Sequence, residues 1–325
     1  MKAIVYSNRG SPDILKLEEI ERPTPGDDEV LIKVRAASVN PLDSGLSRHP
    51  FLRRILFAIS KSKINRPGRD VAGPVEAVGS NVTQFKPGDA VFGLCGGAFA
   101  EYACASASAL AMKPDNASFE EAASVPLAGL TALQGLRKGK IQPGQKVLIN
   151  GAAGGVGTFA VQIAKSYGAE VTGVCSTRNV EMVRSIGADR VFDYTREDFT
   201  KSGQHYDLIF DLVANHSFSA RRRVLNPKGT YIGAGIVGLG GSMVRLLAHQ
   251  ITKLLMSRFV SQKVVTLMAK ISKEDLAILG ELIEAGKVTP VIDRCYSLSE
   301  VPDAIRYLEE GHARGKVVIT FQSPA

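Results

Sequence analysis

The chain lacks tryptophan altogether and has only four cysteines among its 325 residues. No two of the cysteines form a Cys-x-x-Cys pair, and their wide spacing is unlike that of a zinc knuckle or a disulfide framework. These absences argue against a fold held together by metal or disulfide bonds. Reduced, mostly buried thiols are expected instead, as in a cytoplasmic protein, at Cys95, Cys104, Cys175 and Cys295.

Targeting and membrane-spanning segments are also missing from the sequence. No apolar run approaches the ~20 residues that a transmembrane helix needs. No signal peptide opens the chain, because residues 1–6 already have a strand pattern. These two absences predict a cytoplasmic protein.

Acidic residues are fewer than basic ones, 32 against 40, which gives a formal net charge of +8. Such an excess can indicate nucleic-acid binding, but no recognition motif and no interleaved aromatic pattern supports that interpretation. A solvated basic surface together with an anionic cofactor explains the charge better, so no nucleic-acid partner is expected. The hydrophobic fraction of 45% is ordinary for a globular enzyme, and the length predicts about two domains.

The first third of the chain consists of short β-branched or alternating runs at residues 2–6, 30–36, 71–78 and 90–92. Turn signals rich in Pro and Gly, such as residues 86–89, separate these runs. This spacing predicts an antiparallel, barrel-like domain.

The rhythm changes at about residue 118. Ser118 and Glu121 have the spacing of a capping box, which predicts the start of a helix. Strand and helix patterns then alternate, and this alternation predicts an α/β fold with a doubly wound parallel sheet, which has helices on both faces. The expected strands are residues 146–150, 170–175, 190–192, 208–212 and 230–233, and the expected helices are 127–135, 155–167 and 180–186. Further on, helices at 273–285 and 301–310 lead to a final strand at 316–321, which we expect to rejoin the first domain.

A glycine-rich turn lies between the strand 146–150 and the helix that follows it. Glycine lets the backbone approach a pyrophosphate closely, and the helix N-terminus supplies free N–H donors and a positive dipole end. Glycine turns also serve simple packing, but the strand before and the helix after match the dinucleotide-binding motif. The expected cofactor-binding residues are Gly151, Gly154, Gly155, Val156 and Gly157.

The end of the next strand indicates which dinucleotide is bound. An NAD site usually has Asp or Glu there, whereas this strand is followed by Ser176, Thr177 and Arg178. Two hydroxyls and a guanidinium suit a 2′-phosphate, so NADPH is the expected cofactor. The alternative is that Arg178 is only an exposed residue at a helix start. Tyr194, after the following strand, is expected to close over the same end of the nucleotide.

Motifs along nearly the whole chain resemble those of a medium-chain dehydrogenase/reductase of the zinc-free quinone oxidoreductase branch. The resemblance implies a GroES-like, β-barrel-type catalytic domain at 1–123 and 270–325, a Rossmann domain at 124–269, and a homodimer. It also implies that Thr131 faces the cofactor. The matching stretches are residues 36–43, 68–73, 78–79, 86–89, 151–157 and 315–318.

The chain departs from the zinc-dependent branch of that family at the metal ligands. The resemblance places Asn40 where the zinc branch has a ligand cysteine and Arg69 where it has a ligand histidine. Arginine stays protonated and cannot serve as a ligand, so no metal is expected. Without a Lewis acid, hydride transfer requires an electrophilic acceptor, namely a lipophilic quinone or an α,β-unsaturated carbonyl.

Candidate catalytic residues are few. Asn40 is expected to make a polar contact near the nicotinamide or the substrate carbonyl, although it could equally be a turn residue before Pro41. His49 is a weaker candidate for the proton donor, with a loop residue and protonation by solvent as the alternative. Two other functions stay open: a nucleotide-binding regulatory or structural protein without turnover, and a zinc-type alcohol dehydrogenase, which the missing ligands disfavour.

Two segments, 46–65 and 243–263, mix apolar and basic residues in the manner of amphipathic helices. They predict either a helical lid, a weak peripheral contact with anionic lipid, or a partner-binding face. Residues 264–268 predict a strand that either lies inside the sheet or pairs across the two-fold axis of a homodimer.

Overall fold

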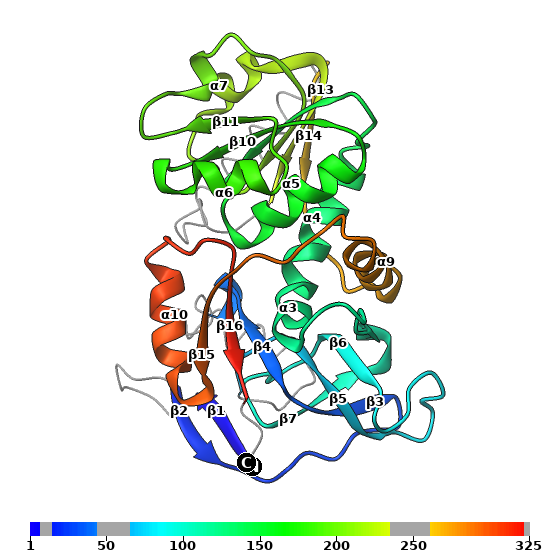
Figure 1. Cartoon of the computed structure of the whole chain (residues 1–325). Coiled ribbons are helices and arrows are strands. Elements are labelled where there is room, and N and C mark those ends of the chain that lie inside the picture. The colour runs from blue at the N-terminus through cyan, green and yellow to red at the C-terminus, as the bar shows by residue number, and fades with distance from the viewer. Residues whose placement is uncertain (7–14, 44–65, 235–260, 322–325) are drawn as a thin grey trace. The chain divides into compact units, whose positions relative to one another are not determined.

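The computed structural model describes residues 1–6, 15–43, 66–234 and 261–321 (Figure 1). The chain divides into two compact units. The first unit comprises Met1–Leu130, Ile271–Gly286 and Pro290–Ala325, and the second comprises Thr131–Lys270 and Lys287–Thr289.

The first unit is built mainly from antiparallel strands whose apolar residues alternate into one core. In its larger sheet the strand order is β15-β16-β4-β5-β3-β7, with β6 pairing with β5 and β8. Strands β1 and β2 form a separate pair, and the Ile4 N–H of β1 donates to the Phe99 carbonyl oxygen at 2.8 Å. The strands are β1 (Lys2–Tyr6), β2 (Leu15–Glu19), β3 (Glu29–Lys33), β4 (Ala36–Val39), β5 (Asp70–Val78), β6 (Ala90–Leu94), β7 (Tyr102–Ser106) and β8 (Leu110–Met112).

The C-terminal strands return to this unit, as the sequence predicted. β16 (Lys316–Thr320) pairs antiparallel with β4, so that Val318 lies opposite Ser38. β15 (Ile292–Ser297) runs parallel to β16, and α10 (Val301–Glu309) connects the two. The capping box also forms, because Ser118 and Glu121 bond reciprocally at the start of α3 (Phe119–Ser124).

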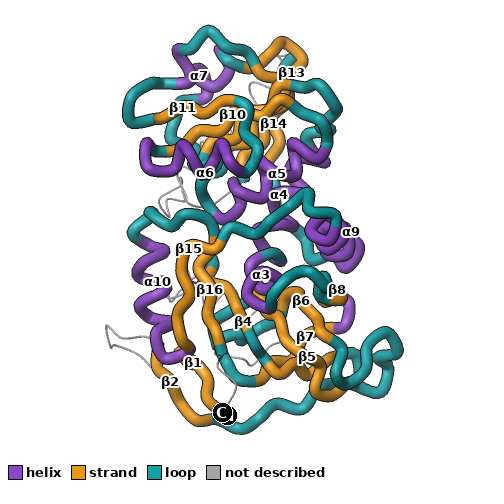
Figure 2. Tube along the Cα trace, viewed as in Figure 1, coloured by secondary structure: helices purple, strands orange, loops and turns teal. Residues whose placement is uncertain are grey.

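The second unit is a parallel sheet of six strands in the order β11-β10-β9-β12-β13-β14. Helices alternate with these strands along the chain (Figure 2). The order reverses between β9 and β12, which is the arrangement of a doubly wound fold. The strands are β9 (Lys146–Asn150), β10 (Glu170–Cys175), β11 (Arg190–Asp193), β12 (Tyr206–Asp211), β13 (Leu225–Gly233) and β14 (Lys263–Thr266).

Most helices begin or end within two residues of the expected positions, and the side chains of Ser118, Ser217 and Ser272 cap the starts of α3, α7 and α9. α4 begins in the first unit and ends in the second, and this explains why residues 124–130 belong to the first unit rather than to the expected 124–269 domain. Residues 287–289 belong to the second unit because Thr289 and Gln162 exchange two hydrogen bonds. The other helices are α4 (Pro126–Lys138), α5 (Gly155–Ser166), α6 (Val180–Ser185), α7 (Phe218–Arg223) and α9 (Lys273–Glu284), with 3₁₀ turns at Ala107–Ala109, Thr177–Asn179, Phe199–Lys201 and Leu298–Glu300.

Several expectations concern residues that the structure does not describe. The amphipathic segment 46–65 and nearly all of 243–263 lie outside the described residues, as does His49. Strand β14 lies at the end of the strand order, with β13 as its only partner among the described residues. Among the described residues, no helix has the length and apolar character needed to cross a membrane.

Candidate functional site

The glycine turn of the second unit joins the end of β9 to the start of α5. Gly151 has a φ of +89°, which an L side chain rarely adopts, and a Cβ there would press on Val213 at 2.9 Å. A Cβ at Gly157 would collide with the Gly151 carbonyl oxygen. At Gly154, by contrast, a Cβ would meet only that same oxygen at 3.5 Å. Gly151 and Gly157 therefore shape the turn, and Gly154 leaves open space at the helix end.

The N-terminus of α5 presents donors and positive charge to that space. Gly154 is the N-cap residue and has no side chain to bond the first N–H groups, and the first turn contains no acidic residue. The first N–H groups of a helix have no partner within the helix, and the aligned peptide dipoles make this end electropositive. These N–H groups, of Gly155, Val156 and Gly157, are the kind of donors that bind a pyrophosphate, and the expected role of these residues in cofactor binding stays a prediction.

The three residues after β10 differ in their exposure and in their hydrogen-bond partners. Ser176 is half-buried, whereas Thr177 and Arg178 are exposed. The Thr177 hydroxyl donates to the carboxylate of Asp193 at 2.5 Å, and this bond, with help from Thr195, lowers the pKa of Asp193. Thr177 is therefore committed to an ionised acid that belongs to the neighbouring strand, β11. Reading one strand at a time missed Asp193, although the parallel order of β10 and β11 brings their ends together.

Tyr194 and Thr131 were the other expected cofactor residues. The Tyr194 backbone N–H donates to Cys175 O at 3.0 Å, which holds Tyr194 beside the end of β10, and its side chain is 57% exposed. Thr131 is half-buried in α4. Their contacts with a cofactor stay predictions.

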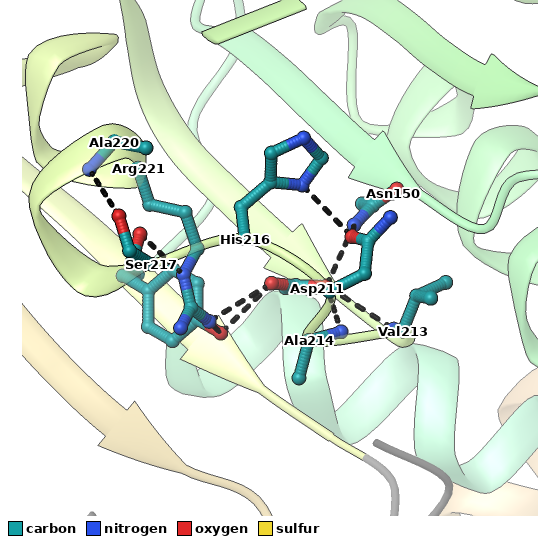
Figure 3. A network of polar contacts seen from close by, with 10 residues as sticks. Asn150, Asp211, Val213, Ala214, His216, Ser217, Ala220 and Arg221 are labelled. Atoms are coloured by element: carbon teal, nitrogen blue, oxygen red, sulfur yellow. Dashed lines mark hydrogen bonds and ion pairs between the residues drawn. The ribbon is translucent and has the colours of Figure 1, made fainter. Parts of the chain in front are cut away.

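A buried carboxylate, Asp211, lies at the end of β12 beside the glycine turn. Figure 3 shows it between Arg221 on one side and Asn150 on the other. One carboxylate oxygen accepts from Asn150 Nδ2 at 2.9 Å and from the backbone N–H groups of Val213 and Ala214. The other accepts from Arg221 Nη1 at 3.0 Å and from the Tyr231 hydroxyl at 2.9 Å.

Both oxygens of the Asp211 carboxylate accept hydrogen bonds, and the cluster is buried, with Asp211 1% exposed and Arg221 8% exposed. Burial and the nearby carboxylate raise the pKa of Tyr231, so its hydroxyl stays protonated and keeps donating. Because a buried charge is tolerated only when paired and hydrogen-bonded, the cluster fixes the loop after β12 against the residue that precedes the glycine turn.

The first unit contains a second buried cluster, around Asp70. Its carboxylate accepts from the Ser38 hydroxyl at 2.7 Å and from Asn40 Nδ2 at 3.0 Å, and Lys316 Nζ lies at 3.3 Å. The other oxygen accepts from the backbone N–H of Leu127, in the first turn of α4. Lys316 also donates to Asn40 Oδ1 at 2.8 Å. Lys316 lies in the matching stretch 315–318, but no sequence signal indicated its contact with Asp70, from which it is separated by 246 residues.

Asn40 is held inside this Asp70 cluster. It is 3% exposed, and its two amide N–H groups go to Asp70 and to the Ser38 carbonyl oxygen. Its expected contact with a nicotinamide or substrate carbonyl stays a prediction. To make that contact, an amide N–H of Asn40 would first have to leave Asp70 or the Ser38 carbonyl oxygen. Next to it, Asp43 accepts from the N–H groups of Asn40 and Gly68, yet burial raises its pKa to about 6.

Among the residues that the structure describes, no three side chains of His, Cys, Asp or Glu gather as the ligands of an ion would. Arg69, at the position that the zinc branch gives to histidine, is exposed.

Comparison with known proteins gives two family matches. Residues 26–115 match the alcohol dehydrogenase GroES-like domain, and residues 186–319 match the zinc-binding dehydrogenase family. Together they cover parts of both units.

Two relatives and one solved structure match almost the whole chain. The chain is 37% identical to the chloroplastic quinone-oxidoreductase QR1 of Triphysaria versicolor, over 98% of each chain. It is also 37% identical to the chloroplastic NADPH-dependent alkenal/one oxidoreductase of Arabidopsis thaliana, over 98% of this chain and 79% of the relative. The structure of the quinone oxidoreductase from Coxiella burnetii superposes with a TM-score of 0.87 at 32% identity, over 99% of each chain. This chain belongs to the medium-chain dehydrogenase/reductase superfamily, in its quinone-oxidoreductase-like branch.

Proposed function

We propose that this protein is an NADPH-dependent oxidoreductase that transfers a hydride to a quinone or to an α,β-unsaturated carbonyl, without a metal. The observation that carries the proposal is the open cradle of the glycine turn at the N-terminus of α5. The names of the relatives, a quinone oxidoreductase and an alkenal/one oxidoreductase, support the class of acceptor.

The bound dinucleotide would supply the hydride, and the chain supplies binding and orientation. The cradle binds the pyrophosphate through backbone N–H groups, so its affinity does not depend on side chains that could move. The Asp211 cluster keeps the end of β12 fixed against Asn150, one residue before the turn. A fixed site of this kind lowers the entropy cost of bringing two reactants together.

NADPH rather than NADH is the cofactor that the end of β10 favours. Arg178 offers a planar, permanently charged group, and Ser176 adds a hydroxyl. Thr177 contributes less than expected because its hydroxyl already donates to Asp193. The ionised Asp193 opposes a 2′-phosphate, but Arg196 lies 3.4 Å from it and offsets part of that charge.

The direct test is turnover by the purified protein. NADPH oxidation would be followed by absorbance with a panel of quinones and alkenals, and NADP⁺ reduction with primary and secondary alcohols would serve as the control. We expect oxidation with at least one electrophilic acceptor, no reaction with alcohols, and no loss of activity after chelation. NADPH binding without turnover on any acceptor would instead favour a regulatory or structural protein, and a stoichiometric, activity-linked zinc would favour an alcohol dehydrogenase.

We further propose a homodimer. The edge position of β14 and the 85% exposure of Met268 just beyond it support a surface that a second copy could cover. Sedimentation velocity tests this directly, and a monomer at micromolar concentration would overturn it. The cytoplasmic location and the lipid contact of segments 46–65 and 243–263 stay predictions; vesicle co-sedimentation at low and moderate salt tests the second.

A further inference from the structure

The orientation of Asn150 follows from its partner. A carboxylate only accepts hydrogen bonds, so the atom of the Asn150 amide that faces Asp211 at 2.9 Å is the nitrogen. The second N–H of that nitrogen points to the side-chain oxygen of Asn215 at 3.1 Å. The Asp211 cluster therefore determines not only the backbone of the loop but also which end of the Asn215 amide faces inward.

His216 fixes the same oxygen from a second direction. Its Nδ1 lies 2.8 Å from Asn215 Oδ1, and because an amide oxygen can only accept, Nδ1 carries the proton. The His216 ring is itself held edge-on against Phe199, with Nε2 at 3.4 Å from Asp198. Two donors thus hold the carbonyl end of Asn215, and the amide nitrogen has to point away from both.

That nitrogen is available to a ligand. Asn215 is exposed, and its amide nitrogen makes no hydrogen bond with any residue in the described ranges. An exposed asparagine side chain normally samples several rotamers, whereas this one is oriented by a network anchored on a buried carboxylate. Such preorganisation lowers the entropy cost of binding.

The position of Asn215 matches the cofactor site of an open α/β sheet. Ligands of such sheets bind at the carboxyl ends of the strands where the strand order reverses, which here lies between β9 and β12. Asn215 lies in the loop that follows β12, which ends at Asp211, and Asn150 ends β9. In the same loop, Val213 packs against Gly151 of the glycine turn, and Ala214 adopts a left-handed φ of +57° that its N–H bond to Asp211 supports.

Building on the proposed function, we propose that Asn215 is a cofactor-binding residue whose amide nitrogen donates to an oxygen of the dinucleotide, either on the ribose or on the pyrophosphate. The cluster of Asp211, Arg221 and Asn150 positions it. This assigns to the loop after β12 a direct polar contact with the cofactor, in addition to the backbone cradle at the helix.

Titration of the purified protein with NADPH, by fluorescence or calorimetry, tests the proposal. Asn215→Ala removes the donor, and we expect the Kd for NADPH to rise about fivefold, the range for loss of one hydrogen bond. The kcat at saturating NADPH should stay within about twofold and the melting temperature within about 2 °C, since the side chain is exposed. A change in KM without a change in kcat separates binding from a general loss of structure.

Asn215→Asp distinguishes the two oxygens. It keeps the acceptor for Asn150 and His216 but adds a negative charge, so it weakens binding more than Asn215→Ala if the partner is the pyrophosphate. If the partner is a ribose hydroxyl, the carboxylate can still accept from it, and Asn215→Asp binds more tightly than Asn215→Ala. Either order supports the contact.

A matched control is Asn81→Asp, an exposed asparagine of the first unit that already donates to Asp28 at 3.0 Å. We expect it to leave the Kd unchanged. Wild-type binding together with an unchanged Kd in both Asn215 variants would overturn this inference and leave the proposed function standing. A wild-type protein that binds neither NADPH nor NADH would overturn both.

Discussion

Asp70 in the first unit and Asp211 in the second are buried carboxylates of the same design. Each is at most 1% exposed, and each accepts from an asparagine side chain, from backbone N–H groups and from a buried cation, Lys316 or Arg221. They differ in the acceptor that the second amide N–H of the asparagine bonds. Both amide N–H groups of Asn40 donate to acceptors inside the Asp70 cluster, whereas the second amide N–H of Asn150 donates to the exposed Asn215.

The difference indicates that the Asp70 cluster is structural and that the Asp211 cluster also orients a residue at the surface. The Asp70 cluster joins β4, β5, β16 and the start of α4, and it ends in the interior. The Asp211 cluster begins in the interior and ends beside the glycine turn. We therefore expect disruption of the first to appear mainly as lost stability and disruption of the second to appear also as lost cofactor affinity.

The largest effect is expected from Lys316→Met. It leaves Asp70 buried without its cation, and breaking a buried pair from one side costs about 3–5 kcal/mol of unfolding free energy. Chemical denaturation followed by circular dichroism measures this. The double variant Lys316→Met, Asp70→Leu removes both charges and should recover part of the loss; a single variant within 1 kcal/mol of wild type, on the order of the value for an exposed pair, would contradict the assignment.

Arg221→Met should cost less, about 2–3 kcal/mol, because Tyr231 and three other donors still bond Asp211. The informative measurement is the KM for NADPH relative to that of Lys316→Met. We expect the KM to rise more in Arg221→Met, since this cluster holds the loop beside the turn. An equal rise in both variants would remove the distinction between the two clusters.

Gly154→Ala should change binding without changing the fold. Its Cβ would lie 3.5 Å from the nearest atom and so fits, but it occupies the cradle. We expect a rise of about 10–100-fold in the Kd for NADPH, equivalent to about 1.4–2.8 kcal/mol, with a nearly unchanged melting temperature. Normal NADPH affinity in this variant would show that the nucleotide binds elsewhere than at the glycine turn.

Arg178→Ala tests the choice of cofactor. Loss of the guanidinium should lower the NADPH-over-NADH preference in kcat/KM by about tenfold, or 1.4 kcal/mol, while the NADH value changes little. The control is Arg196→Ala, which removes the partner of Asp193 and should also disfavour NADPH, but less. A preference unaffected by Arg178→Ala would favour its being an ordinary exposed residue.

The smallest effect concerns pH and Asp43. Its folded pKa of about 6 lies above the unfolded value, so the folded state binds more protons between about pH 4 and 6, and stability falls as pH rises through that window. Between about pH 5 and about pH 7 this group should lower the unfolding free energy by about 1 kcal/mol. Asp43→Asn should lack that component; an identical pH dependence in both proteins would contradict the raised pKa.

Sequence patterns predicted most of the elements. Strands 146–150 and 170–175 and the capping box at Ser118 form as predicted, because spacing and local capping chemistry act over a few residues. The glycine turn was recognisable for the same reason. Asp193 was missed because its partner Thr177 lies in the turn after a different strand, β10. Asn40 was interpreted without Lys316, whose ammonium donates to it from the last strand of the chain.

The sequence alone therefore determined the two kinds of domain and the place of the glycine turn, since period, glycine and capping signals are local. Only the tertiary structure decided which polar residues form hydrogen bonds inside the fold and which are exposed at the surface. Asn40 and Asn215 are the same residue type in loops after strands. The partner of Asn40 that is most distant in the chain is Lys316, 276 residues away, and one of the two donors that hold Asn215 is Asn150, 65 residues away; the other, His216, is its neighbour in the sequence. Such pairings depend on how the strands are ordered, and strand order has no local signature.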